Sequence, residues 1–418
     1  MNYVIIGNGP TGVIAAETLR GADPAGKVIL VGDEPEPPYS RMAIPYLLAE
    51  EIREEGTYLR KDPAHFQSLG IEMIQGRAKS LDTGKRQVTL EDGKVLPYDR
   101  LLVASGSRPV AAPIPGIDLP GVHSCWTLAD ARAIEKRAKP GSKVLQMGAG
   151  FIGCIILEAL AARGVQLTVV EMGNRMVPRM MTEGAGGLIK GWCEKKGVKV
   201  FTSTKVDAIE KSGSGLKVKL NNGQVLDADL VISATGVRPN VEWLKGSGVT
   251  VDTGVKVDER MQTSVAGVYA AGDVAQAGEF YTGNFIVNAI QPNAADQGRV
   301  AALNMAGKGA TSQGSLAMNV LDTLGLISSS FGQWMGVPGG DHAELMDPEN
   351  FRYLRLEFKD DVLVGATSLG LTQHVGVLRG LIQGSIHLGA WKEHLQQDPT
   401  RIMEAYLAMA QAQARRAA

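Results

Sequence analysis

Residues 3–12 read YVIIGNGPTG, and this stretch decides the fold of the chain. The apolar run 3–6 is typical of a buried β-strand, and VIAAETLR (13–20) has a helical pattern. The glycines of the loop between them permit a tight turn. They also let backbone N–H groups approach a pyrophosphate at the N-terminus of the helix. The stretch therefore predicts a strand–loop–helix unit that binds a dinucleotide.

An acidic pair follows the second strand of this unit. KVILV (27–31) is strand-like and ends at Gly32, Asp33 and Glu34. A carboxylate at this position can accept hydrogen bonds from both ribose hydroxyls of an adenosine. The strand, loop, helix and acid occur in the order that a dinucleotide site requires.

The same unit recurs in the middle of the chain. KVLQM (143–147) is a strand, GAGFIG (148–153) is the loop, and a helix and a second strand lead to Glu171. Glu171 would repel a 2′-phosphate, which favours NAD over NADP. The nearby Arg175 could in principle pair with such a phosphate. The chain therefore has two predicted dinucleotide sites.

Three further segments fit the same plan. LLVASGSRP (101–109) and LVISATGVRPN (230–240) are each a strand that ends in a turn of small residues. GVYAAGDVA (267–275) ends in Gly272 and Asp273, and an aspartate there can bind a ribityl hydroxyl. QPNAADQG (291–298) opens a helix with proline in its first turn. The N-terminus of such a helix would stabilise negative charge on a flavin ring.

Composition limits the alternatives. The chain has 418 residues, 44% of them hydrophobic and 21% charged, which fits a soluble globular protein of two or three domains. A net charge of −1 argues against nucleic acid or an anionic membrane as a partner. No apolar run reaches the roughly 18 residues that span a bilayer. The chain starts as a strand rather than as a signal peptide, so we expect a cytoplasmic protein.

Cysteine and histidine give no sign of a metal site. The 3 cysteines, Cys125, Cys154 and Cys193, form no CxxC motif, and the 6 histidines show no ligand spacing. Sparse cysteines fit a reducing compartment. We therefore expect neither a metal nor an iron–sulfur cluster held by this chain alone.

The order of these motifs resembles a known family. GNGPTG, DEP, PYSR, ASGSRP, GAGFIG, VVE, ATGVRPN, AAGD and NAADQGRVAALNMAG resemble the FAD- and NAD-linked reductases that have two dinucleotide-binding domains. The nearest branches are the rubredoxin, ferredoxin and nitrite-reductase-type NADH reductases. The resemblance is dense over residues 1–310 and weaker beyond. It implies FAD and NAD(H) as cofactors.

The resemblance assigns residues to both sites. The FAD site would consist of Gly7, Gly9, Pro10, Thr11, Gly12, Asp33, Glu34, Arg41, Ala78, Ala104, Ser105, Gly106, Arg108, Gly272, Asp273, Asn293 and Ala294. The NAD site would consist of Gly148, Gly150, Phe151, Ile152, Gly153, Glu171, Ala234, Thr235 and Gly236. In this assignment Ala78 meets the adenine through its backbone and Asp273 holds the ribityl chain.

Residues 38–48, PYSRMAIPYLL, depart from the pattern of the disulfide-reducing branches. Those relatives carry one or two redox cysteines in this segment, and this chain has none. Many relatives also pair a lysine with a glutamate beside flavin N5, at the positions of Tyr46 and Ile155. Loss of both charges avoids a buried unpaired charge. We expect a less polar site at N5, covered by Tyr46, unless the alignment is shifted there and Tyr46 only packs.

The expected fold is α/β, with two Rossmann-like domains and a small C-terminal α+β domain. The FAD-binding domain would comprise residues 1–115 and 241–315, the NAD-binding domain 116–240 and the interface domain 316–418. A hairpin is expected about Asn222 and Gly223, and another over FRYLRLEF and VLVGATSL. The last helix has an apolar face, which would cover its own domain or dock on a partner subunit: Ile402, Met403, Tyr406, Leu407 and Ala410.

Together these features predict an FAD-dependent oxidoreductase that exchanges a hydride with NAD(H) and single electrons with an iron–sulfur partner. Residues 39–52 and the altered N5 site resemble the FAD subunits of phenylglyoxylate dehydrogenase and tungsten aldehyde oxidoreductase complexes. A stand-alone NADH:rubredoxin or ferredoxin reductase is the alternative. An NADH oxidase or peroxide reductase, and a non-enzymatic flavin-bearing scaffold, are further alternatives.

Overall fold

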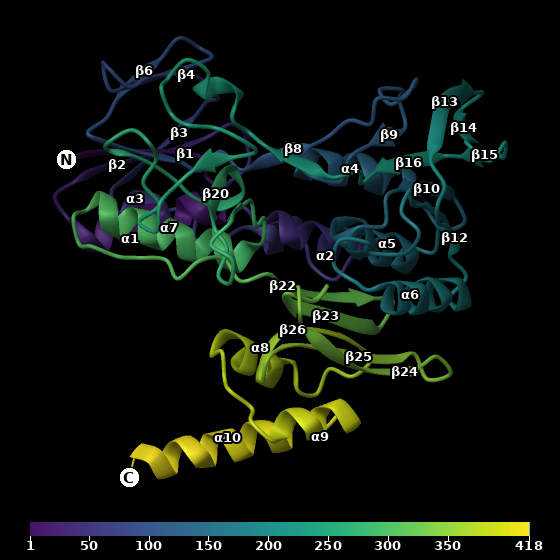
Figure 1. Cartoon of the computed structure of the whole chain (residues 1–418). Helices are drawn as coiled ribbons and strands as arrows, with labels where there is room; N and C mark the ends of the chain where they lie inside the picture. The colour runs from purple at the N-terminus through teal and green to yellow at the C-terminus, as the bar shows by residue number, and fades with distance from the viewer. Residues whose placement is uncertain (418) are drawn as a thin grey trace. The chain divides into compact units, whose positions relative to one another are not determined.

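The computed structural model describes the backbone of residues 1–417 and the side chains of residues 1–411. Its contacts divide the chain into two compact units (Figure 1). Unit 1 comprises residues 1–110 and 237–315, and unit 2 comprises residues 111–236 and 316–418. The predicted NAD-binding and C-terminal segments thus fall within the same unit.

Unit 1 is built on a parallel sheet whose strand order is β19-β7-β1-β2-β3. The strands are β1 (Asn2–Ile6), β2 (Lys27–Gly32), β3 (Ile71–Gln75), β7 (Arg100–Val103) and β19 (Val268–Ala270). Their apolar runs are almost wholly buried, as expected for a parallel sheet covered on both faces. The order reverses between β1 and β7, which creates the crevice where such sheets bind ligands.

The helices of unit 1 are α1 (Pro10–Ala22), α2 (Ile44–Leu48), α3 (His65–Ser68) and α7 (Gln291–Met305). Helices α1 and α7 pack against each other (Figure 1). Smaller sheets are formed by β4 (Ala78–Asp82), β5 (Gln87–Leu90) and β6 (Val95–Pro97), and by β18 (Val255–Lys256), β20 (Ala275–Gly278) and β21 (Phe285–Ile286).

Two strands at the unit boundary pair with each other. β8 (Ser107–Pro109) runs antiparallel to β17 (Val237–Pro239), and Arg108 lies opposite Arg238. These strands come from the ASGSRP and ATGVRPN segments. The chain therefore leaves unit 1 and returns to it through neighbouring strands.

Unit 2 repeats the parallel arrangement in the order β12-β11-β10-β16-β9. The strands are β9 (Val122–His123), β10 (Lys143–Met147), β11 (Gln166–Val170), β12 (Lys199–Phe201) and β16 (Leu230–Ser233). The helices of this part are α4 (Leu128–Arg137), α5 (Phe151–Ala162) and α6 (Glu183–Lys195). The predicted α/β class with two parallel sheets is confirmed.

The antiparallel sheets of unit 2 contain the two hairpins that the sequence predicts. β13 (Val206–Ser212), β14 (Gly215–Leu220) and β15 (Val225–Ala228) form one sheet, with the predicted turn at Asn222 and Gly223. The C-terminal sheet has the order β22-β23-β26-β25-β24. Its strands are β22 (Met318–Thr323), β23 (Leu326–Gly332), β24 (Asp341–Asp347), β25 (Arg352–Lys359) and β26 (Val362–Leu369). The predicted hairpin is the β25–β26 pair.

The chain ends with α8 (Val375–Gln383), α9 (Trp391–Gln397) and α10 (Ile402–Ala417). In α10, Ile402 and Ala405 are buried, whereas Tyr406 and Leu407 are 41% and 51% exposed. The predicted apolar face is thus only partly covered by its own unit. Within residues 1–417 no helix combines the length and apolar character needed to cross a membrane.

Candidate functional site

The first glycine loop connects β1 to α1, and its glycines have different tasks. A Cβ on Gly7, whose φ is +118°, would lie 2.0 Å from the carbonyl oxygen of Ala104. A Cβ on Gly12 would lie 1.8 Å from the carbonyl oxygen of Gly7. These two glycines are required by backbone packing. A Cβ on Gly9 would meet nothing within 4 Å, so open space lies at the N-terminus of α1.

A cavity of 430 Å³ opens in unit 1 beside this loop. Residues at the carboxyl ends of β1, β2 and β7 line it, which places it at the reversal of strand order. Five of its lining residues were predicted from the sequence: Gly7, Asp33, Ala78, Ser105 and Arg108. The loop and the cavity fit the adenosine and pyrophosphate parts of FAD.

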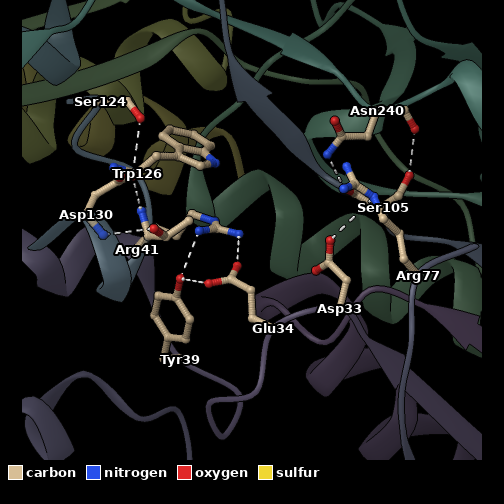
Figure 2. Close-up of polar contacts among 11 residues, drawn as sticks. Asp33, Glu34, Tyr39, Arg41, Arg77, Ser105, Ser124, Trp126, Asp130 and Asn240 are labelled. Atoms are coloured by element: carbon tan, nitrogen blue, oxygen red, sulfur yellow. Dashed lines mark hydrogen bonds and ion pairs between the residues drawn. The ribbon is translucent and has the colours of Figure 1, made fainter. Parts of the chain in front are cut away.

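The two acids after β2 have different surroundings (Figure 2). Asp33 lines the cavity, and its Oδ2 lies 3.9 Å from Nε of Arg77. Glu34 accepts hydrogen bonds from Nη2 of Arg41 at 2.6 Å and from the Tyr39 hydroxyl at 2.7 Å. Glu34 thus fixes the side chain of Arg41, and Asp33 is the acid that we expect to bind a ribose.

The cavity has one wall that sequence reasoning missed. Asn240, Glu242 and Trp243 line it, and they come from the segment that returns to unit 1. The Ser105 hydroxyl donates to the Asn240 carbonyl at 2.9 Å, and Asn240 Nδ2 donates to the Ser105 carbonyl at 2.8 Å (Figure 2). The likeness of ASGSRP to ATGVRPN is the signal that could have suggested this pairing.

Arg108 lies between two of these residues. It forms an ion pair with Glu242, with Nη1 donating to Oε2 at 2.8 Å, and Nη1 also donates to Asn240 Oδ1 at 2.6 Å. The hydrogen bonds from Arg108 lower the pKa of Glu242 from 4.5 to about 2. Arg108, on β8, thus binds two residues that follow β17, the strand with which β8 pairs.

We expect Arg108→Ala to weaken the dependence of stability on pH below 4.5. A carboxyl with a depressed folded pKa contributes stability above pH 4.5 that is lost as the pH falls from 4.5 toward about 2. Without Arg108 this loss should largely vanish. Thermal unfolding at several pH values in this window measures it, and Glu242→Gln should flatten the curve in the same way. Equal pH dependence in wild type and both variants would contradict the assignment.

Asp273 follows β19 and is half-buried. Its Oδ2 accepts a hydrogen bond from the Ser107 hydroxyl at 2.8 Å, and burial raises its pKa. Gly272, at φ +79°, lies so close to Thr11 that a Cβ would be 2.3 Å from the Thr11 hydroxyl oxygen. Gln297 of α7 accepts from the Gly272 N–H at 2.9 Å. This turn thus brings Asp273 beside α1 and α7.

The remaining predicted FAD residues lie on the same elements. Pro10 is in the first turn of α1, and Ala104 and Gly106 follow β7. Asn293 and Ala294 are in the first turns of α7. The Asn293 side chain donates to the Asn288 carbonyl at 2.9 Å and accepts from the Ser315 hydroxyl at 2.9 Å. Any contact of Asn293 with a flavin would therefore use its backbone.

The second glycine loop has the same construction in unit 2. Gly148 has φ +94°, and its Cβ would lie 2.4 Å from the carbonyl oxygen of Ala234. A Cβ on Gly153 would lie 2.5 Å from the carbonyl oxygen of Gly148, whereas one on Gly150 would meet nothing within 4 Å. Open space thus again lies at the N-terminus of a helix, where a pyrophosphate fits.

The other predicted NAD residues surround this loop. Phe151 and Ile152 form the first turn of α5, and Thr235 and Gly236 follow β16. Glu171 is buried after β11, where Oε2 accepts from the Ala149 N–H at 2.6 Å and Oε1 from the Gly173 N–H at 2.7 Å. Glu171 therefore also holds the loop in place.

Arg175 is engaged within its own turn. Its Nε donates to the Met181 carbonyl at 2.8 Å and its Nη2 to the Pro178 carbonyl at 3.1 Å. Its Nη1 donates to Asn174 Oδ1 at 2.8 Å. These bonds leave it poorly placed to pair with a 2′-phosphate, which supports the predicted preference for NAD.

We expect Glu171→Gln to narrow the preference for NADH over NADPH by roughly tenfold, because it removes a negative charge beside the 2′ position. An amide oxygen can keep a hydrogen bond to the loop. Steady-state kcat/KM values for both nucleotides measure the ratio. Glu194→Gln, which neutralises an exposed glutamate of α6 outside both sites, should keep the wild-type ratio. An unchanged ratio in Glu171→Gln would show that another group excludes NADPH.

Tyr46 lies on α2 and is 55% exposed. The segment around it is attached to the start of α7, since the Ser40 hydroxyl donates to Gln291 Oε1 at 2.7 Å. Its proposed place beside flavin N5 stays a prediction. Tyr46→Ala should alter the flavin spectrum and the rate of flavin reduction by NADH in stopped flow. If neither changes, Tyr46 only packs.

The three cysteines are all free and buried. Burial raises the pKa of Cys125 and of Cys193 to about 12, and it raises that of Cys154 well above the usual value. Such thiols are poor nucleophiles. Among the described residues no three histidine, cysteine or acidic side chains are grouped to hold a metal ion.

Comparison with known proteins agrees with this geometry. The family model for pyridine nucleotide-disulphide oxidoreductases matches residues 1–298. The chain is 33% identical over 361 residues to the epsilon subunit of NADH-dependent phenylglyoxylate dehydrogenase from Aromatoleum evansii, covering 86% of each chain. It is 32% identical over 276 residues to the ferredoxin–NAD(+) reductase subunit of the benzene 1,2-dioxygenase system from Pseudomonas putida, covering 66% of this chain and 67% of the other.

A solved structure shows the same fold. The covalent putidaredoxin reductase–putidaredoxin complex gives a TM-score of 0.88 at 24% identity, covering 97% of this chain and 99% of the other. Fold and site together define an FAD-dependent oxidoreductase that uses NAD(H). The chain belongs to the pyridine nucleotide-disulphide oxidoreductase family.

Proposed function

We propose that this chain is the FAD subunit of a larger oxidoreductase, in which it exchanges a hydride with NAD(H) and single electrons with an iron–sulfur subunit. An aldehyde or a 2-oxoacid such as phenylglyoxylate is the proposed class of upstream substrate. The similarity to the epsilon subunit, which extends over 86% of both chains, supports this role. The predicted domain boundaries and the cytoplasmic location belong to the same proposal.

The observation that carries the proposal is the segment 38–48. It has no thiol, and it forms a 3₁₀ turn (Arg41–Ala43) and α2, fastened to the start of α7 by Ser40. The three cysteines elsewhere are buried. A dithiol relay of the disulfide-reducing type has no residues to use here. Two exits remain consistent with the chain: one-electron transfer to a separate redox centre, which we propose, and direct transfer to a small acceptor, as in an NADH oxidase.

The chain's own residues would bind and orient the cofactors. The loop at Gly9 and the side chain of Asp33 would hold the adenosine diphosphate of FAD, and Asp273 its ribityl chain. The loop at Gly150 and the carboxylate of Glu171 would hold NAD(H). When bound, FAD supplies the exchange between a hydride and single electrons. Hydride transfer needs no acid or base from the protein.

A stand-alone NADH:ferredoxin or rubredoxin reductase is the second candidate. The similarity to the ferredoxin–NAD(+) reductase subunit favours it. The low net charge of −1 weighs against it, because steering of a mobile acceptor usually needs a strong surface field. Since the chain belongs to a family of enzymes, the non-enzymatic scaffold is not retained.

The test is an anaerobic pull-down of the tagged chain from its native host, with metal analysis of the purified material. Stoichiometric recovery of an iron–sulfur or tungsten subunit is expected. A Gly150→Val variant of the tagged chain should recover the same partner but fail to pass electrons between it and NAD(H). A flavoprotein that is recovered alone, and reduces added ferredoxin or rubredoxin with NADH, would establish the second candidate instead.

A further inference from the structure

We propose that Trp243 is the residue on which the adenine of FAD stacks. This rests on the proposed use of the unit 1 cavity for FAD, and it assigns a role to a residue that the motifs do not include. Trp243 lies in a short 3₁₀ helix, η3 (Glu242–Leu244), just after the chain returns to unit 1.

Trp243 is the aromatic side chain of the cavity. Among the described residues that line the 430 Å³ space, the others are aliphatic, glycine, polar or charged. A purine has two large apolar faces, and stacking on an aromatic ring is the usual way for a protein to bind one. The composition of the cavity thus directs the adenine to Trp243.

The position of η3 agrees with this role. It packs against β4, the strand that begins with Ala78, and both elements line the cavity. The Thr83 hydroxyl donates to the Ser247 carbonyl at 2.7 Å, which links the residue after β4 to the turn that follows η3. Asp33, the acid placed to bind the ribose, lines the same cavity. An adenine attached to that ribose would lie between β4 and η3.

The polar atom of Trp243 already has a partner. Its Nε1 donates to the Ser105 hydroxyl at 3.4 Å, and its half-buried side chain packs against the core of unit 1. The neighbouring Glu242 is held by Arg108. The indole is therefore fixed before a ligand arrives, which lowers the entropy cost of stacking.

The proposal predicts which ligands depend on Trp243. FAD and ADP contain the adenine, whereas FMN contains the flavin and its phosphate alone. We expect Trp243→Leu to weaken FAD and ADP binding to the apoprotein by about tenfold, as base–aromatic stacking implies, and to leave FMN binding unchanged. Trp243→Phe should retain most of the affinity. Trp391→Leu is the matched control: it removes a tryptophan of α9, outside the cavity, and should leave the affinity for all three ligands unchanged.

All chains carry Gly150→Val, so that ADP cannot occupy the second glycine loop. Titration calorimetry of these apoproteins with the three ligands provides the affinities. ADP should also quench tryptophan fluorescence in wild type and in Trp391→Leu, but not in Trp243→Phe. This second readout keeps the test valid if Trp243→Leu does not fold. Quenching by ADP that survives in Trp243→Phe, or an equal loss of FMN and FAD affinity in Trp243→Leu, would overturn the proposal. A wild-type chain that binds no FAD would refute the proposed function itself.

Discussion

A Gly9→Val chain should be purified folded and colourless. The structure leaves open space where its Cβ would lie, so the substitution should cost the apoprotein little. The same space is where we expect the pyrophosphate to lie, at the N-terminus of α1. We expect the affinity for FAD to fall by roughly 100-fold or more, because a branched side chain and the phosphates cannot both occupy it. Flavin absorbance per chain and titration of the apoprotein with FAD measure the loss.

Gly21→Ala is the matched control for this prediction. Gly21 lies in the same helix, and a Cβ there also meets nothing within 4 Å. It should bind FAD normally and gain slightly in helix stability. Full flavin content in Gly9→Val would contradict the assignment of the loop. Loss of flavin together with a collapse of thermal stability would indicate misfolding, which far-ultraviolet circular dichroism of the apoprotein identifies.

A Gly150→Val chain should show the reverse pattern. It should remain yellow, because its change lies in the loop of unit 2, where a Cβ again meets nothing within 4 Å. Reduction of the flavin by NADH should slow by roughly 100-fold or more at low NADH, because the nucleotide's pyrophosphate loses its place. Stopped-flow absorbance after anaerobic mixing measures the rate.

Dithionite distinguishes this effect from damage to the flavin. It reduces flavin without a nucleotide site, so it should bleach Gly150→Val and wild type alike. Gly9→Val and Gly150→Val therefore serve as reciprocal controls, one for each site. If Gly150→Val is reduced by NADH at the wild-type rate, the second loop does not bind the nucleotide that reacts.

The motifs were sufficient to predict the two parallel sheets and the residues of both glycine loops. They have this power because Gly7, Gly12, Gly148 and Gly153 are each required by a backbone contact that would exclude a side chain. The pattern of apolar residues also predicted the hairpins at Asn222–Gly223 and β25–β26, where local turns fix the pairing.

The motifs did not predict the wall of the cavity that Asn240, Glu242 and Trp243 form. Asn240, Glu242 and Trp243 contact Ser105 and Arg108 only after the chain has passed through residues 111–236 of unit 2. A pattern of spacing carries no information on such a return. Nor could the sequence decide between Asp33 and Glu34. The difference in their surroundings depends on Arg41, whose ion pair with Glu34 is set by side-chain geometry.

The face of α10 shows a different limit. The periodicity of the sequence predicted an apolar face on this helix. Ile402 on this face is buried, whereas Leu407 is exposed. A hydrophobic pattern shows that one face of a helix is apolar, but it does not show which neighbouring element covers that face.

The pairing of β8 with β17 has a consequence for the exchange of segments between this chain and its relatives. Pro109 and Val237 are partners across two adjacent antiparallel strands, so the ends of the long excursion between them are already side by side. Closing that gap needs no more than the tight turn of a hairpin. Residues 111–236 are thus inserted between two paired strands of unit 1, and they also pack against the C-terminal sheet, where α5 contacts β22. Exchange of residues 111–236, together with the C-terminal segment 316–418, for those of a relative is a route to chimeras with a new nicotinamide preference. In such chimeras the cavity of unit 1 keeps all of its own residues.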